Sequence, residues 1–531
     1  MMLQLLPNHR MFAQPPITWT ADLSIDDTNP VPNCTCINLT FELTQAWLDD
    51  EPMTDITLDL YLLSGKYEMC GNPGFVLQSG QIPVAGLGAE NGLADVWRMT
   101  GVSIPSIDDG GMLTILVSVR VVGSINDPEQ SIAFSARYES NVIGPETEGP
   151  VIPDYTVIIV GAPSTTTSLQ EVATGELDHL AQPPGGTGQD VLIEGTLLVD
   201  VSYDFANNSN LHIAPGAIIK VQNGATFRLL DLTHVRGCQN TWQGIEILAG
   251  GSFVADGSTD QYPSEMVVIE DAENAVIARD GSSVSAKQTI FRNNGKGIFV
   301  PKNSNFNYAV IVVEQCWFET TSFSFLGGVA GVYVNDLVST VSLKENTFFD
   351  FYYGVYASNC VSVVSRNNRF TNMQTGNFCS GVALLDNLGN FFQNMQFGIK
   401  SENSNLVVRG DKFMDIGETG IYASSSSGAH YLTQAGLGLN ENNPTFSSCK
   451  TGIATFNMEV LAEQNVMKEM KTGFLLNNYG GKKNAVVRNN IVRAGNLGIG
   501  IQGWKVLSSL EVSGNDIHIE GEVPYATGIL G

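Results

Sequence analysis

Few stretches of this 531-residue chain carry side chains at a spacing that could do chemistry. The clearest is the tetrad Arg409-Gly410-Asp411-Lys412, which places one carboxylate between cations. Such a set could hold calcium and supply the base of a lyase, and its Arg-Gly-Asp triplet is of the kind that integrins bind. Because the tetrad falls in a corner between expected strands, where exposed charges are common, we interpret it as a solvated surface turn.

Residues Gly498–Gly503 read GIGIQG and match the G-x-G-x-x-G pattern of dinucleotide-binding sites. That pattern indicates a nucleotide site only when it follows a strand and opens a helix. Here it is followed by Trp504–Val512, another strand-like run. We therefore interpret these glycines as a tight corner and expect no nucleotide cofactor.

Metal chemistry has little support in the sequence. The histidines do not come within the spacing of metal ligands: they are His9, His179, His212, His234, His430 and His518. Three acidic loops offer the oxygen ligands that calcium prefers, but none has a full ligand set: Asp26-Asp27, Asp49-Asp50-Glu51 and Asp108-Asp109. The sequence thus predicts no catalytic, cofactor-binding or metal-binding residues, and calcium is the one cofactor that it leaves open.

Clustered aromatic residues offer a different chemistry, the binding of sugar rings. They are Trp317, Phe318, Phe323, Phe325, Phe348, Phe349, Phe351, Tyr352 and Tyr353. Such residues either form an exposed platform or stack in the core, and we expect core stacking for at least half of them.

The elements that must position these residues follow a repeat. The stretch Val341–Asn359 (VSLKENTFFDFYYGVYASN) predicts a strand, an Asn corner, an aromatic step and a second strand, with Gly354 at the turn. From Val191 on, short strands arrive about every ten residues. Glycines followed by an apolar residue recur at 297, 331, 354, 381, 398, 420, 452, 473, 498 and 528, at intervals from 17 (381 to 398) to 34 (297 to 331).

A period of this length indicates a repeat architecture. Leucine-rich repeats keep a tighter period and propeller blades a longer one, so short strands joined by variable turns predict a right-handed parallel β-helix with rungs about 4.8 Å apart. One axial stack is expected from Ile298, Val332, Val355, Val382, Ile399, Ile421, Ile453, Phe474, Ile499 and Ile529. Corner asparagines are expected to form amide ladders: Asn293, Asn346, Asn368, Asn465, Asn490 and Asn515.

The N-terminal part lacks this repeat. Residues 1–16 are expected to be an N-terminal arm or the remnant of an export signal. Residues 17–145 predict an antiparallel β-sandwich, with strands at Ile37–Leu43, Ile56–Leu63, Gly74–Ser79, Leu113–Val122 and Ser131–Ser140. Residues 146–190 are expected to be a linker and β-helix cap, and residues 191–531 the β-helix. The predicted fold class is all-β.

Composition narrows the range of partners. Lys and Arg number 27 against 54 Asp and Glu, so the net charge of −27 disfavours nucleic acid and anionic membranes. No stretch approaches the roughly 18 apolar residues of a membrane span, so we expect no membrane insertion. Cys34 and Cys36 lie two residues apart on one expected strand, a poor geometry for bridging each other, and in an oxidising compartment either could pair with Cys70. The remaining cysteines are expected to be small buried side chains: Cys238, Cys316, Cys360, Cys379 and Cys449.

The first rungs are the most specific part of the sequence. His234–Gly251 (HVRGCQNTWQGIEILAGG), preceded by Gly195–Phe205 and Leu211–Gly224 and followed by Ile269–Val284, resembles the secreted β-helix repeat proteins of Bacteroidota, which are similar to the pectin-lyase superfamily. The resemblance covers roughly Thr156–Gly531. It implies a pectin-lyase-like fold and type IX secretion, although the C-terminal sorting domain typical of such proteins is not found before Gly531.

Related β-helices include polygalacturonases, which need clustered carboxylates and motifs of the form N-T-D and G-H-G. This chain has Asn240-Thr241-Trp242 at the first and no later G-H-G. We therefore expect an extracellular or cell-surface structural or adhesive protein rather than an enzyme, whose partners are surface glycans, proteins or itself. Because the last rung, Ala526–Gly531, is apolar, we expect either that the native chain continues beyond Gly531 or that another subunit stacks there, giving a head-to-tail filament. The alternative is a polysaccharide-binding or polysaccharide-cleaving β-helix enzyme.

Overall fold

The computed structural model divides the chain into two units, Met1–Ile159 and Val160–Gly531, which are described separately. The structure describes Gly74, the nine strands β1 to β9 of the first unit and, from there on, residues 158–160, 163–174, 190–205, 208–238, 241–257, 266–302, 308–320, 328–336, 339–437, 440–479, 483–502, 509–519 and 527–530. The N-terminal arm, the three acidic loops, Cys34, Cys36 and Cys70 lie outside the described residues.

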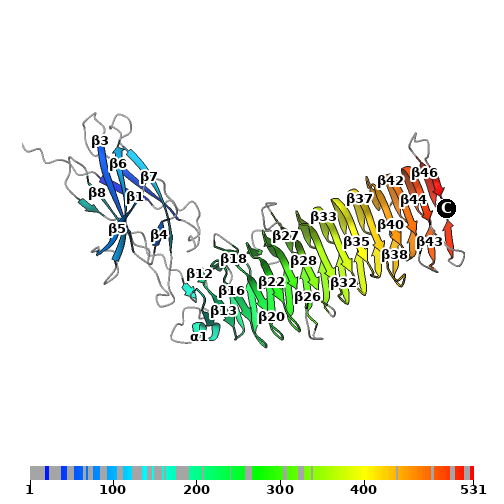
Figure 1. Cartoon of the computed structure of the whole chain (residues 1–531), viewed down its shortest axis with the longest axis horizontal. Helices are drawn as coiled ribbons and strands as arrows, with labels where there is room; N and C mark the ends of the chain where they lie inside the picture. Colours follow the sequence, from blue (N-terminus) through cyan, green and yellow to red (C-terminus); the bar gives the residue numbers. More distant parts are fainter. Residues whose placement is uncertain are drawn as a thin grey trace, which may run out of the picture. The chain divides into compact units, whose positions relative to one another are not determined.

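The first unit contains two antiparallel sheets in its described residues (Figure 1). One sheet has the order β1 (Thr18–Asp22), β2 (Ile37–Thr44), β7 (Met112–Val121) and β4 (Tyr67–Met69). The other has the order β5 (Val76–Pro83), β6 (Leu93–Ile104), β3 (Met53–Leu63), β8 (Phe134–Glu139) and β9 (Glu146–Glu148). The strand pattern in the sequence had not predicted β1 or the long strand β6.

The second unit is a right-handed parallel β-helix, so the predicted fold class is confirmed. Figure 1 shows its strands side by side along one axis, from the cyan end to the red end. The described residues form a 25-stranded sheet, to which most rungs contribute two strands and five rungs a single longer strand, and a 13-stranded sheet, to which a rung contributes at most one. A six-residue helix, α1 (Leu169–Thr174), lies near the start.

The strands of the 25-stranded sheet are, in order, β10 (Ile158–Val160), β11 (Thr166–Ser168), β12 (Asp190–Ile193), β13 (Thr196–Val199), β15 (Asn210–Ile213), β16 (Ile218–Val221), β18 (His234–Gly237), β19 (Gly244–Ile247), β21 (Val267–Glu270), β22 (Asn274–Ala278), β24 (Thr289–Arg292), β25 (Lys296–Val300), β27 (Trp317–Glu319), β28 (Ala330–Asn335), β30 (Thr347–Phe349), β31 (Tyr353–Ser358), β33 (Arg369–Ser380), β35 (Phe391–Glu402), β37 (Lys412–Ser424), β39 (Phe446–Ser447), β40 (Thr451–Phe456), β42 (Val466–Asn477), β44 (Ile491–Gln502), β46 (Asp516–Ile519) and β47 (Thr527–Leu530). Those of the 13-stranded sheet are β14 (Tyr203–Phe205), β17 (Thr226–Leu230), β20 (Ser252–Asp256), β23 (Ser283–Lys287), β26 (Val310–Glu314), β29 (Thr340–Lys344), β32 (Ser362–Arg366), β34 (Leu384–Leu388), β36 (Leu406–Arg409), β38 (Tyr431–Ala435), β41 (Glu459–Glu463), β43 (Ala485–Arg488) and β45 (Leu510–Ser513).

The predicted axial stack exists with one correction. Its members lie opposite one another from rung to rung: Ile298, Val332, Val355, Asn377, Ile399, Ile421, Ile453, Phe474, Ile499 and Ile529. The predicted place of Val382 in the stack was wrong, because Asn377 of β33 occupies that level. Val382 is also buried, but it lies beyond the end of β33.

A second stack explains the glycine before each apolar residue. Seven rings lie face to face with centroids 4.7–4.9 Å apart: Phe291, Phe318, Phe348, Phe370, Phe392, Phe413 and Phe446. Each ring from Phe318 onward packs on a glycine of the preceding rung, and a Cβ on Gly376 would lie 2.4 Å from Phe392 Cδ1. Gly354 and Gly498 likewise lie inside β31 and β44, so the predictions of a turn at Gly354 and a corner at GIGIQG were wrong.

Buried amides form two ladders at another corner. The first ladder contains Asn346, Asn368, Asn390 and Asp411. The Oδ1 of each member after Asn346 accepts from the backbone N–H and the side-chain Nδ2 of the member on the preceding rung. The second contains Asn465, Asn490 and Asn515. Five of the six predicted asparagines are thus confirmed. The prediction that Asn293 joins a ladder was wrong. Asn293 has a left-handed φ of 52°, and the buried amide beside it belongs to Asn294.

The first ladder also corrects the interpretation of the Arg-Gly-Asp triplet. Asp411 is 0% exposed, and its Oδ1 accepts from Asn390 N at 2.8 Å. Arg409 extends to Asp386, 2.5 Å away on the neighbouring rung. The tetrad is therefore not a solvated turn that an integrin could reach, since its carboxylate is part of the core.

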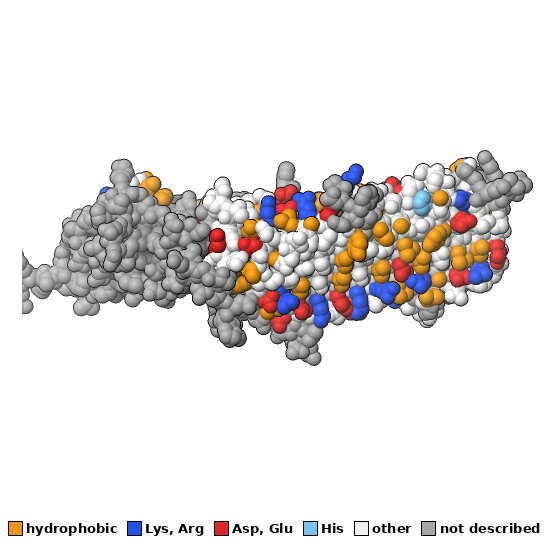
Figure 2. Space-filling model, turned by 90° about the horizontal axis from the view of Figure 1, so that it is seen from below, with side chains coloured by type: hydrophobic (Ala, Val, Ile, Leu, Met, Phe, Trp, Pro, Cys, Tyr) orange, Lys and Arg blue, Asp and Glu red, His pale blue; other side chains and the backbone are white. Residues whose placement is uncertain are grey.

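Cysteines and surface charges complete the β-helix. Cys316, Cys360, Cys379 and Cys449 are buried free thiols, as predicted, whereas the buried Cys238 is disulfide-bonded. On the outer face of the 13-stranded sheet, ion pairs join neighbouring rungs, for example Lys344 with Glu314. Figure 2 shows acidic and basic side chains alternating along one edge of the visible face.

Candidate functional site

The candidate site is built on the corner between the two strand segments that each rung adds to the 25-stranded sheet. Asp350, Asn372, Asn394 and Asp415 have left-handed φ values of 62°, 56°, 55° and 55°. Asp and Asn adopt this conformation more readily than other residues with a side chain. The residues just before them pair in register across four rungs, so the four side chains form one column, here called the corner column.

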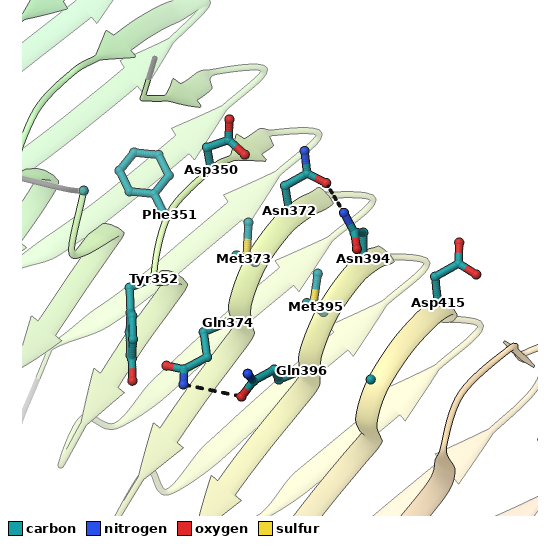
Figure 3. Close-up of a pocket in the computed structure, with 12 residues that line it drawn as sticks. Asp350, Phe351, Tyr352, Asn372, Met373, Gln374, Asn394, Met395, Gln396 and Asp415 are labelled. Carbon is teal, nitrogen blue, oxygen red and sulfur yellow. Dashed lines mark hydrogen bonds between the residues drawn. The ribbon is translucent and has the colours of Figure 1, made fainter. Parts of the chain in front are cut away.

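A groove of about 930 Å³ runs beside the corner column (Figure 3). It is lined by Gly328, Asp350, Phe351, Tyr352, Asn372, Met373, Gln374, Asn394, Met395, Gln396, Asp415 and Gly417. Buried Met373 and Met395 form its apolar base, while the amides of Gln374 and Gln396 lie beyond them. The groove therefore combines an apolar floor with repeated polar groups on both sides.

Hydrogen bonds give the polar groups fixed directions. Asn394 Nδ2 donates to Asn372 Oδ1 at 2.6 Å, so the amide oxygen of Asn372 is directed at the next rung. Partial burial raises the pKa of Asp350, an effect that the hydrogen bond from Asn372 opposes. On the other side, Gln374 Nε2 donates to Gln396 Oε1 at 3.5 Å (Figure 3).

Tyr352 stands at one end of the groove and is 50% exposed. Its ring meets Tyr353 edge to face at 4.6 Å. Further along the sheet, Tyr333, Tyr356 and Phe378 stack face to face, so their neighbours cover their ring faces. In Figure 3 the Tyr352 ring stands edge-on to the viewer, with Gln374 beside it. Of the two aromatic residues that line the groove, Phe351 is buried and Tyr352 is exposed, so Tyr352 is the ring that a ligand can reach.

The predicted aromatic cluster divides between core and surface, and three of its seven described members are buried. Phe318, Phe348 and Phe351 are buried, whereas Trp317, Phe349 and Tyr352 are exposed and Tyr353 is half-buried. Phe323 and Phe325 lie outside the described residues. Only two of these residues, Phe351 and Tyr352, line the groove.

A second cluster joins carboxylates to bases near the start of the β-helix. Glu270 Oε1 lies 2.7 Å from His234 Nε2, and Arg292 bridges Glu270 and Glu319. Burial alone would raise the pKa of Glu270, but His234 and Arg292 lower it, whereas burial and the neighbouring Glu270 raise the pKa of Asp271 to about 6. Alternating charges that pair across neighbouring rungs are typical of a stabilising ion-pair network, and we assign the cluster that role.

The described residues hold neither a candidate metal centre nor a helix that could span a membrane. They contain no group of three or more His, Cys, Asp or Glu side chains that could hold a metal ion. They also contain no helix that is both long and apolar enough to cross a membrane. Tyr352 was among the residues predicted from the sequence, whereas the corner column was not. Its one signal in the sequence is the regular spacing of its members, 22 residues from 350 to 372 and from 372 to 394, and 21 from 394 to 415.

No family model and no curated protein matches this chain. Among solved structures, it is similar to a family 28 exopolygalacturonase of Yersinia enterocolitica, with 9% identity, 90% of this chain and 96% of that chain covered, and a TM-score of 0.23. It is also similar to the catalytic domain of a GH87 alpha-1,3-glucanase variant in complex with nigerose, with 10% identity, 97% and 98% coverage, and a TM-score of 0.17. Likenesses this weak do not bear on function.

Proposed function

We propose that the β-helix binds a polysaccharide chain in the groove without cleaving it. The observation that carries this proposal is the corner column, which repeats a polar side chain once per rung along the groove. A polymer lying along the axis would meet an equivalent group at each step. Sugar hydroxyls both donate and accept hydrogen bonds, and the amides of Asn372, Asn394, Gln374 and Gln396 offer both partners.

The apolar part of the groove supports the same ligand class. A sugar ring has polar edges and less polar faces, so an aromatic face complements it well. Tyr352 provides such a face, and Met373 and Met395 provide an adaptable apolar floor beside it. A concave, mostly apolar site with a few placed polar groups is the usual form of a ligand site.

The spacing of the carboxylates argues against hydrolysis in this groove. Glycoside hydrolases place their two carboxyl groups about 5–9.5 Å apart. The carboxylates among the lining residues, Asp350 and Asp415, lie three rungs apart, or about 14 Å at about 4.8 Å per rung. The groove therefore suits binding better than catalysis. Self-association, secretion and a cell-surface location stay predictions, as does an adhesive role, which glycan binding would serve.

The first expected result concerns Tyr352. Replacing it by alanine (Tyr352→Ala) should weaken the binding of the preferred polysaccharide about tenfold or more, since exposed aromatic anchors often contribute over about 1.4 kcal/mol. Affinity electrophoresis and calorimetry against a panel of neutral, acidic and amino polysaccharides would identify the ligand. The matched control is Tyr431→Ala, a partly exposed tyrosine of β38 in the other sheet, which should leave binding unchanged. Equal losses in both variants would contradict the site.

A second result is expected from the same panel. No polysaccharide that binds should release reducing or unsaturated sugar ends during prolonged incubation, because the lining carboxylates are too far apart to act on one bond. Thin-layer chromatography and a reducing-end assay would check this. Cleavage that disappears in Asp350→Asn or Asp415→Asn would show that the groove is catalytic.

A further inference from the structure

The hydrogen bonds of the corner column run in one direction. The amide pair of Asn372 and Asn394 sets that direction. The Oδ1 of Asn372 then faces the next rung, where it accepts from Asn394 Nδ2 at 2.6 Å. Asn394 has thus used its donor group on the Asp350 side of the column, and its Oδ1 remains as an acceptor.

The next member of the column is another acceptor. Asp415 lies one rung from Asn394, about 4.8 Å along the axis, and its ionised carboxylate has no hydrogen to donate. Both side chains are exposed at the groove. This end of the groove therefore presents an amide oxygen and a carboxylate to the same space, an arrangement that a ligand with several donors and a positive charge would satisfy.

The charge of the groove points the same way. Among the twelve lining residues two are Asp and none is Lys or Arg. The whole chain carries a net charge of −27, which repels anions and attracts cations over long range. A polyuronate would add its own carboxylates to this field, and a neutral glycan would leave the carboxylates without a counter-charge.

We propose that the groove selects a polysaccharide with free amino groups, whose ammonium is held between Asn394 Oδ1 and the Asp415 carboxylate. An ammonium group has three donors and no acceptor, so it can bond both oxygens at once. The Asp350 carboxylate offers a second contact at the other end of the groove, beside Tyr352. This inference rests on the proposed function and names its ligand class.

The test compares three probes of equal length by calorimetry: β-1,4-linked glucosamine oligomers, the corresponding N-acetylglucosamine oligomers and oligogalacturonate. The glucosamine oligomer should bind about tenfold or more tightly than its acetylated form, and the oligogalacturonate should bind least. Asp415→Asn should abolish the preference for the free amine while leaving a side chain of the same shape.

Non-specific attraction of a cation to an acidic protein needs its own control. Glu418 lies on the same strand, β37, outside the groove lining, and is paired with Lys450 at 2.7 Å. Glu418→Gln removes the same charge as Asp415→Asn, so general attraction would fall equally in both variants. The proposal requires the amine preference to survive in Glu418→Gln.

The outcomes separate the two proposals. Equal affinity for free and acetylated oligomers, or equal effects of the two substitutions, would overturn the amine site while leaving glycan binding intact, provided that Tyr352→Ala still weakens binding. Tightest binding of the oligogalacturonate would also overturn it. If none of the probes or panel polysaccharides binds, the proposed function itself fails.

Discussion

Replacing Phe392 by alanine should lower the free energy of unfolding by about 3–5 kcal/mol, since the ring is 0% exposed and its loss opens a cavity in the core. The ring stacks between Phe370 and Phe413 at 4.8 and 4.9 Å, so both neighbours lose a contact as well. Chemical denaturation followed by circular dichroism would measure the change. Phe349→Ala is the control, because that ring is 39% exposed on the outer face, and we expect a much smaller change there.

The glycine opposite this ring gives a second route to the same test. Gly376→Ala would place a methyl group 2.4 Å from Phe392 Cδ1 and 2.7 Å from the carbonyl oxygen of Gly398, so it should destabilise strongly. Combining it with Phe392→Ala should cost less than the sum of the two changes, because the missing ring leaves room for the methyl group. Strictly additive costs would contradict the packing of ring on glycine.

Replacing Asp411 by asparagine should stabilise the protein at pH 8 and weaken the pH dependence of its stability. Burial raises the pKa of Asp411 from 3.8 to about 7, although hydrogen bonds from Asn390 lower it in part. The folded state therefore binds the proton more tightly than the unfolded state. Roughly three pKa units correspond to about 4 kcal/mol, the order of the penalty for keeping this buried carboxylate charged.

The sign of the pH dependence follows from these values. Above pH 7 both states are ionised and the penalty is complete; as the pH falls from about 7 to about 4, the folded state takes up the proton and gains stability. Asparagine carries no charge at any pH and keeps the Oδ1 that accepts from Asn390. Thermal unfolding between pH 4 and pH 8 should thus show a smaller change for Asp411→Asn than for the wild type.

The exposed Asp415, four residues after Asp411 in the sequence, supplies the control. Asp415→Asn removes the same charge from the surface and should leave the unfolding temperature nearly unchanged. An Asp411→Asn protein that is less stable than the wild type at pH 8 would mean that the charged carboxylate supports the ladder rather than straining it.

The groove joins these core features to the proposed function. Each of the four rungs beside the groove carries a Phe and a Gly in the interior, a ladder residue at one corner and a left-handed residue at the other. Because the rungs stack in register, the side chain at the second corner repeats at the same spacing as the core. A repeated binding surface for a polymer is therefore a direct consequence of the packing that stabilises the fold.

The repeat was predictable from the sequence because contacts in a parallel β-helix join residues one rung apart. Phenylalanine or another large apolar residue, followed by glycine and a further apolar residue, recurs from rung to rung, and this pattern predicted the fold class and nearly all of the axial stack. Buried side chains must match the level above and below, so the core repeats in type as well as in position. The amide ladders were visible for the same reason, since Asn recurs at corners.

Tertiary structure decided the alignment of rungs and the environment of single residues. Turns of variable length hid the rung to which Gly376 and Asn377 belong, so Gly381 and Val382 had been chosen in their place. Asp411 and Asp415 are four residues apart, just before β37 and within it, yet one is 0% exposed and the other lies on the groove. The sequence cannot distinguish them, because both are Asp. The neighbouring rungs determine which of the two side chains points into the core and which one water reaches.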